Sequence, residues 1–145
     1  MPEFTFKGSA ILKGELESDL IVRGVKIATV SPPPEFGGKE NFMVPEEIFA
    51  SALASCMNTI YTLIAKNSQL PLKNLETTAT VEMNVEGMEK IIFKHIHFDI
   101  LVELEKDTDW NRKKANIILE MAREVCPLRQ SWGDKVPITF NISFK

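Results

Sequence analysis

Histidine and cysteine are scarce in this chain, which contains two of each among its 145 residues. These side chains most often hold zinc, and the sequence suggests no third ligand beside the pair His95 and His97. We therefore expect no metal and no bound cofactor. Long apolar runs are also missing. None reaches the ~18 residues of a membrane-spanning segment, so we expect no contact with a membrane.

An excess of basic residues is missing too. The chain has 17 basic and 20 acidic residues with a formal net charge of -3, which argues against a nucleic-acid surface. The first residues, MPEFTFKGSA, lack the charged and then apolar pattern of a secretory signal, so we predict a cytoplasmic location. Cysteines in that compartment stay reduced unless a disulfide has a transient function. The length predicts one domain, residues 1–145.

The N-terminal part favours short strands before a loop, SPPPEFGGKEN, whose prolines and glycines exclude a helix or a central strand. Turns or bulges are expected at Gly8, Gly14 and Gly24. A helix is predicted to begin at Pro45, because proline suits the first helical position. Glu46 and Glu47 complement the positive end of its dipole. It should extend ~22 residues, to about Asn67.

Apolar residues recur along this helix at spacings of three and four, which predicts a central and largely buried element. The stripe consists of Ile48, Phe49, Ala52, Leu53, Cys56, Ile60, Leu63 and Ile64. Cys56 therefore lies on the face that is expected to meet the core.

A hairpin is predicted next, because residues 76–85 alternate between apolar and polar and Gly87 precedes a second strand over 90–105. In that second strand His95 and His97 share one face, and the apolar residues between and after them share the other. The histidines are therefore expected to face away from the core.

A second helix should follow, capped by Thr108 or Asp107 and ending near Cys126, because Pro127 comes next. Its apolar stripe consists of Ala115, Ile118, Leu119, Ala122 and Cys126. Residues 128–136 are predicted to form a turn, and 137–144 a final strand. This order predicts an α+β fold with mainly antiparallel sheets packed on two main helices.

The two cysteines lie on the apolar stripes of the two predicted helices. Stripes of this kind face one core, so Cys56 and Cys126 are able to meet although they are far apart in the sequence. Either cysteine alone is equally well explained as a small apolar core residue.

Three segments of the chain resemble the OsmC/Ohr family of thiol-dependent peroxidases. VPEEIFASALASCMNTI is similar to that family's cysteine-bearing helix, EVCPLRQSW to its second cysteine site, and PPPEFGG to the loop before the helix. The resemblance implies that Cys56 is the peroxidatic cysteine and Cys126 the resolving one. It also implies an intertwined homodimer with both sites at the interface, organic hydroperoxides as substrates, and an external dithiol reductant, sometimes lipoyl-type.

The resemblance also assigns Glu46 to the family's glutamate after proline, and it calls for an N-terminal arginine near the thiolate. Arg23 is the only arginine before the first helix, but it falls in a predicted hairpin turn, and Lys13 lies closer to the expected place. Glu46 is ~15 Å from Cys56 along one helix, too far to touch it. Either the helix is broken between them, or Glu46 acts through an arginine, across a dimer, or only as a first-turn charge.

A peroxidatic cysteine needs a nearby cation, because only the thiolate attacks and burial raises the pKa of a thiol. The candidates are Arg23, Lys13, Arg123 and Arg129. Because the chain lacks an arginine at the place where the family has one, a second hypothesis stays open. In that hypothesis the chain is a redox sensor or a small-ligand-binding protein that keeps the fold and the thiols.

Overall fold

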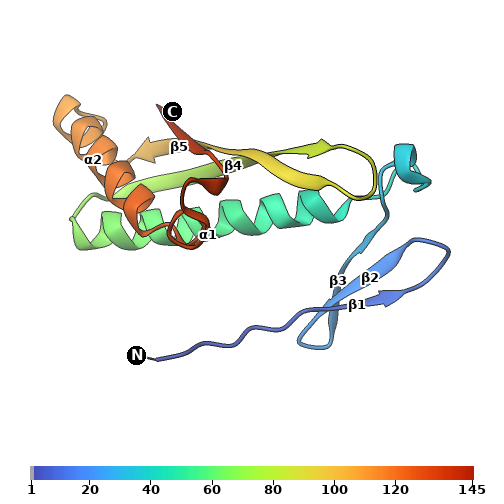
Figure 1. Cartoon of the computed structure of the whole chain (residues 1–145). Coiled ribbons are helices and arrows are strands. Elements are labelled where there is room, and N and C mark those ends of the chain that lie inside the picture. Colours follow the sequence, from blue (N-terminus) through green and yellow to red (C-terminus); the bar gives the residue numbers. More distant parts are fainter. Residues whose placement is uncertain (1) are drawn as a thin grey trace. The chain divides into compact units, whose positions relative to one another are not determined.

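Residues 2–145 are described in the computed structural model of this chain. Their contacts separate two units, one ending at Phe49 and the other running from Ala50 to Lys145, and each is described by itself. Nothing in this division tests the prediction of a single domain. Figure 1 shows the order of the elements along the chain.

The N-terminal unit is built on a three-stranded antiparallel sheet in the order β1-β2-β3. Its strands are β1 (Ser9–Leu12), β2 (Ser18–Val22) and β3 (Val25–Val30). Arg23 and Gly24 form the two-residue turn between β2 and β3, with φ angles of 51° and 77°. Two positive φ angles are typical of the type I′ turn that suits a tight hairpin. The hairpin turn predicted at Arg23 is confirmed.

The proline-rich loop contains a short 3-10 helix, η1 (Pro34–Phe36), and then closes back on β3. The hydroxyl of Ser31 accepts a hydrogen bond from the backbone N–H of Lys39 at 3.0 Å. A Cβ atom on Gly38 would lie 1.6 Å from the carbonyl oxygen of Pro32. Only glycine fits there, which explains the second glycine of the loop.

The long helix α1 (Pro45–Asn67) begins where the proline signal predicts. Its buried residues are Met57, Tyr61 and Ala65, so the prediction that the whole stripe is buried is wrong for the single chain. Cys56 and Leu63 from that stripe are exposed. Apolar residues occur on more than one side of α1, so periodicity alone left the core-facing side undecided.

In the C-terminal unit, the sheet has the order β4-β5-β6. Its strands are β4 (Leu72–Val85), β5 (Ile91–Leu104) and β6 (Ile138–Phe144). The predicted hairpin is confirmed as the antiparallel pair β4–β5, but β6 runs parallel to β5. A parallel neighbour needs a crossover, and here the chain crosses through α2 and α3.

The second helix, α2 (Asp109–Val125), is capped by Thr108, whose hydroxyl accepts a hydrogen bond from the N–H of Asn111 at 3.1 Å. The turn predicted after Pro127 is wrong. That segment forms the short helix α3 (Pro127–Trp132) and the 3-10 helix η2 (Gly133–Lys135). Proline is well placed at the start of a helix, so the signal that ends α2 also begins α3.

The core of the C-terminal unit lies between one face of the sheet and the two long helices, and Figure 1 shows α1 running alongside β4 and β5. All five stripe residues that were predicted to face inward, four on α2 and Cys126 at its end, are buried. On β5 the alternate apolar residues Ile96, Phe98, Ile100 and Val102 are buried, and His95 and His97 face away as predicted. The hydroxyl of Tyr61 donates to the carbonyl of Ala115 at 2.8 Å and joins the two helices.

By length and mean hydropathy alone, α1 is apolar enough to cross a membrane. Core helices meet the same criteria, and α1 contributes three buried residues to the core described above. The prediction of no membrane contact stays a prediction.

Candidate thiol site

The two cysteines sit at different kinds of position on the two long helices. Cys56 lies near the middle of α1 and is exposed, whereas Cys126 caps the end of α2 and is only 3% exposed. Both are free thiols. Close by on α1, Asn58 accepts a hydrogen bond from the hydroxyl of Thr77 on β4 at 2.6 Å, which anchors this part of the helix to the sheet.

Electrostatics links the two thiols. Partial burial raises the pKa of Cys56, and the negative charge of Cys126 raises it further. A charge acts on another only over short range in a protein. The two thiols are therefore close enough for their charges to interact, and the shared site and its disulfide stay predictions.

Two of the cation candidates lie in the same unit as the thiols. Arg129 donates to Glu124 at 2.7 Å, and the charge of Cys126 adds slightly to the rise in the pKa of Arg129. Arg123 lies over the ring of Phe140, 5.3 Å from its centroid. Within residues 50–145, no cation lowers the pKa of Cys56. Activation of that thiol therefore needs a group from outside these residues.

The other candidates belong to the N-terminal unit. Lys13 forms an ion pair with Asp19 at 3.5 Å, so its charge already has a partner. Arg23 is exposed in its hairpin turn, and Glu46 is half-buried in the first turn of α1. No observation on this unit tests the roles of Arg23 and Glu46, which stay predictions.

An apolar concavity of about 440 Å³ lies where the start of β5 meets α3. Ile91, Ile92 and Phe93 contribute one wall, and Trp132 stacks on Phe93 with their ring centroids 5.6 Å apart. The helix that carries Trp132 begins directly after Cys126. Sequence reasoning missed this concavity, because its two walls come from segments that only the fold brings together.

The arrangement offers thiol redox chemistry and little else. In residues 2–145 no group of three or more histidine, cysteine or acidic side chains is placed to hold a metal ion. His95 and His97 instead share a partner, the hydroxyl of Thr139, at 2.7 and 2.6 Å.

Comparison with known proteins identifies the family of the chain. A model described as OsmC-like protein matches residues 37–141.

This chain belongs to the OsmC-like family.

A curated relative of this OsmC-like chain is an organic hydroperoxide resistance protein-like protein of Staphylococcus aureus (strain MSSA476). It is 26% identical over 131 residues, which cover 90% of this chain and 87% of the relative.

Solved structures agree with the fold. The OsmC-like protein of Mycoplasma pneumoniae is 15% identical, with a TM-score of 0.78 and 99% of each chain covered. An organic hydroperoxide resistance protein from Elizabethkingia anophelis is 18% identical, with a TM-score of 0.79 and the same coverage. The predicted α+β OsmC-like fold is thereby confirmed, with mixed as well as antiparallel sheets.

The prediction of family from three short segments is confirmed as well. One structural residue near Cys56 was missed from the sequence. Tyr61 ties α1 to α2 five residues after Cys56, and nothing local distinguishes it from other apolar residues of the helix.

Proposed function

We propose that this OsmC-like protein is a thiol-dependent peroxidase that reduces organic hydroperoxides. The observation that carries the proposal is the electrostatic influence of Cys126 on Cys56, the chain's only two cysteines, each of which belongs to a different helix. The names of the Staphylococcus and Elizabethkingia relatives, which refer to organic hydroperoxide resistance, support the same chemistry.

The exposures of the two thiols support their roles. Cys56 is exposed, so a peroxide can reach it from solution. Cys126 is buried beside it and protected from direct oxidation, which suits a thiol that acts only after the first step.

The cycle follows from ordinary thiol chemistry. The thiolate of Cys56 attacks one peroxide oxygen, the O–O bond breaks, and the leaving alkoxide takes up a proton to become an alcohol. Cys56 is thereby oxidised to a sulfenic acid. The sulfur of Cys126 then attacks that of Cys56, water leaves, and a disulfide forms. An external dithiol, for which we favour a lipoyl-type compound, reduces the disulfide by exchange and is itself oxidised.

Activation of Cys56 is the demanding step, because burial and the charge of Cys126 both raise its pKa. A cation within ~4–6 Å would favour the thiolate. We assign this role to Arg23, with Glu46 orienting it, in the homodimer that the family resemblance implies, and we place that homodimer in the cytoplasm. Exposed apolar side chains of the N-terminal unit, including Phe4 at 76% and Phe6 at 87% exposure, support a second copy that covers them.

A peroxide-consumption assay with cumene hydroperoxide and dihydrolipoamide tests the activity. The wild type should turn over, and Cys56→Ser should fall to the uncatalysed rate. Cys126→Ser should consume about one equivalent and then slow, since its sulfenic acid has no resolving thiol. Ser55→Ala, an exposed neighbour on α1, serves as the control and should keep the wild-type rate. Full turnover by Cys56→Ser would overturn the proposal.

The role of Arg23 is tested by the rate at which Cys56 is alkylated at increasing pH, in a Cys126→Ser background. Arg23→Met should raise the pKa of Cys56 and slow peroxide consumption, whereas Lys7→Met removes an exposed charge of the same unit and should change neither. An unchanged pKa in Arg23→Met would remove Arg23 from the mechanism. Light scattering tests the homodimer, and a monomer at micromolar concentration would contradict it.

The alternative function, a redox sensor or small-ligand-binding protein, is favoured by one observation. No cation within residues 50–145 lowers the pKa of Cys56. A sensor would form the disulfide with one equivalent of peroxide and show no sustained turnover with a dithiol, so the same assay separates the two functions.

A further inference from the structure

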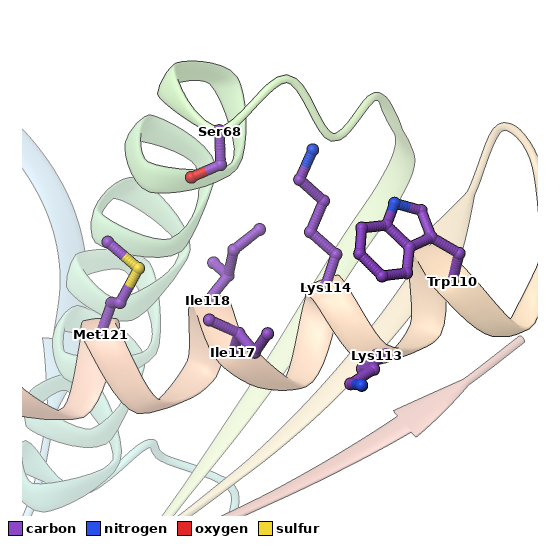
Figure 2. A pocket seen from close by; sticks show the side chains of 7 residues that line it. All are labelled: Ser68, Trp110, Lys113, Lys114, Ile117, Ile118 and Met121. Atoms are coloured by element: carbon purple, nitrogen blue, oxygen red, sulfur yellow. The ribbon is translucent and has the colours of Figure 1, made fainter.

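A second cavity lies where the C-terminal end of α1 meets the outer side of α2. Its volume is about 380 Å³, within the ~300–1,000 Å³ range of small-molecule sites. Figure 2 shows its lining, which includes the exposed apolar side chains of Trp110, Ile117 and Met121 from α2. Ser68, just beyond the end of α1, closes one side.

The apolar lining is unusually open to solvent for residues of its type. Trp110 is 69% exposed, Ile117 53% and Met121 47%. These residues follow one another along α2 at helical spacing and form one surface, away from the face that packs in the core. A contiguous exposed apolar surface with a polar rim is typical of a ligand-binding groove.

The polar rim is cationic. Lys113 and Lys114 both line the cavity, and neither forms an ion pair with any carboxylate of residues 2–145. The arginines of the same helix differ, because Arg112 pairs with Asp107 and Arg123 with Glu120. In Figure 2 the ammonium of Lys114 and the indole nitrogen of Trp110 both point away from α2, on the side where Ser68 lies. The rim therefore offers hydrogen-bond donors and positive charge without a negative partner.

This cavity is separate from the thiol site. The polar rim is the distant part: Lys114 lies ~18 Å along α2 from Cys126, and Ser68 lies a similar ~18 Å along α1 from Cys56, whereas Met121 at the apolar end lies ~7.5 Å along α2 from Cys126. A ligand held here does not need either sulfur.

We propose that this cavity binds a single-chain amphiphilic anion, namely an alkyl carboxylate. The alkyl chain would lie on Ile117 and Met121, which removes apolar surface from water on both sides. The carboxylate would take the unpaired charge of Lys114 and the N–H of Trp110, and Lys113, on the other side of α2 in Figure 2, would add positive charge nearby. Charge-assisted hydrogen bonds of this kind are stronger than neutral ones. Two cations suit one carboxylate and are too few for a polyanion such as a nucleic acid.

The two tryptophans of the chain allow a site-specific test. In a full-length Trp132→Phe background, Trp110 is the remaining fluorophore, and laurate is titrated below its micelle concentration. We expect a saturable change in Trp110 emission. Dodecyltrimethylammonium has the same tail length with a cationic head and should bind at least tenfold more weakly. Calorimetry on the same samples reports binding even if the emission of Trp110 does not change.

Matched variants locate the site. Lys113→Gln with Lys114→Gln should weaken laurate binding about fivefold or more, a change typical of losing two partly exposed charge contacts. Lys90→Gln with Lys94→Gln removes the same charge from the β4–β5 hairpin and should leave affinity within about twofold. Cys56→Ser with Cys126→Ser should likewise leave it unchanged.

Three results would overturn the proposal. The first is the absence of laurate binding by both fluorescence and calorimetry, which includes the case of a dimer that covers the cavity. The second is equal affinity in the two lysine double variants. The third is loss of binding in the double cysteine variant, which would place the laurate at the thiols. None of these results depends on peroxidase activity, so this proposal and the proposed function fail separately.

Discussion

Apolar burial differs sharply between the two units of the chain. The C-terminal unit has a continuous core that includes Tyr61, Phe98 and Ile118, each at most 1% exposed. Among the described residues of the N-terminal unit, Val30 is the only apolar residue that is buried, and Glu17, Asp19 and Ser31 are buried with it. A sheet needs a second layer to cover its apolar face. Helices supply that layer in the C-terminal unit, and nothing within the N-terminal unit does.

Different interactions therefore hold the two units together. The N-terminal sheet relies on its backbone ladder and on ion pairs, such as that of Lys39 with Glu17 and those of Lys13 and Lys26 with Asp19. The C-terminal unit relies on apolar packing of two helices on a sheet. The two units have a similar share of apolar residues, but a core forms only in the unit whose topology provides two facing layers.

The largest effect on stability is expected from a comparison of two phenylalanine substitutions. Phe98→Ala removes a 1% exposed ring that stacks on Phe140 at 5.2 Å, and it should lower the free energy of unfolding by ~3–5 kcal/mol in a urea titration. Phe6→Ala, at 87% exposure, should change it by no more than ~0.5 kcal/mol in a monomer. Equal losses at a concentration where light scattering shows a monomer would break the comparison, whereas a larger loss for Phe6→Ala is expected in the proposed homodimer, where a second copy covers Phe6.

A smaller effect is expected in the proline-rich loop of the N-terminal unit. Gly38→Ala should destabilise by ~1–3 kcal/mol, because its Cβ would lie 1.6 Å from the carbonyl oxygen of Pro32 and the backbone must move. Gly8→Ala is the matched control, since a Cβ there meets nothing within 4 Å. Thermal unfolding of both variants measures the difference. Identical melting temperatures would show that the loop adjusts freely.

Tyr61→Phe probes the C-terminal unit with a smaller change. Loss of the hydrogen bond from the hydroxyl to the carbonyl of Ala115 should cost ~1 kcal/mol, because the ring stays packed and the carbonyl remains buried. Urea unfolding measures this loss, with the exposed neighbour Thr62→Ala as control. A stability equal to that of the wild type would mean that packing alone joins α1 to α2.

The smallest effect should appear as a pH dependence of the N-terminal unit. The hydrogen bond from Lys39 is the main cause that lowers the pKa of Glu17 from 4.5 to about 2. A lowered pKa contributes stability that is present above pH 4.5 and is lost as the pH falls toward 2. Glu17→Gln should therefore reduce the loss of stability as the pH falls. The amide signals of β2 in NMR measure this loss. Exposed Glu15→Gln should leave it unchanged, and the same steep loss in both variants would contradict the assignment.

Local signals account for much of what could be predicted. Pro45 marks the start of α1, Thr108 caps α2, and Pro127 ends it, because each acts through its own backbone or through a residue a few positions away. The alternating patterns of β4 and β5 predicted their hairpin for the same reason. Of the candidate site, the sequence identified the two cysteines and the helices that carry them.

The rest depended on contacts between distant segments. No local signal predicts that β6 pairs in parallel with β5 or that a helix follows Pro127. None predicts that the buried side of α1 carries Tyr61 rather than Leu63. The cavity beside Trp110 and Lys114 was missed because α2 alone shows only an ordinary charged surface there. It becomes a cavity when Ser68 at the end of α1 closes one side.

The amino-acid sequence by itself determined the two long helices, the order of the β4–β5 hairpin between them, the α+β class and the OsmC-like family, because these follow from short-range periodicity, caps and motifs. The tertiary structure alone decided which side of α1 enters the core and that Cys56 stays exposed beside a buried Cys126. It also decided that no cation from residues 50–145 lowers the pKa of Cys56. The physical reason is that burial and electrostatic coupling depend on distances across the fold, which no local pattern specifies.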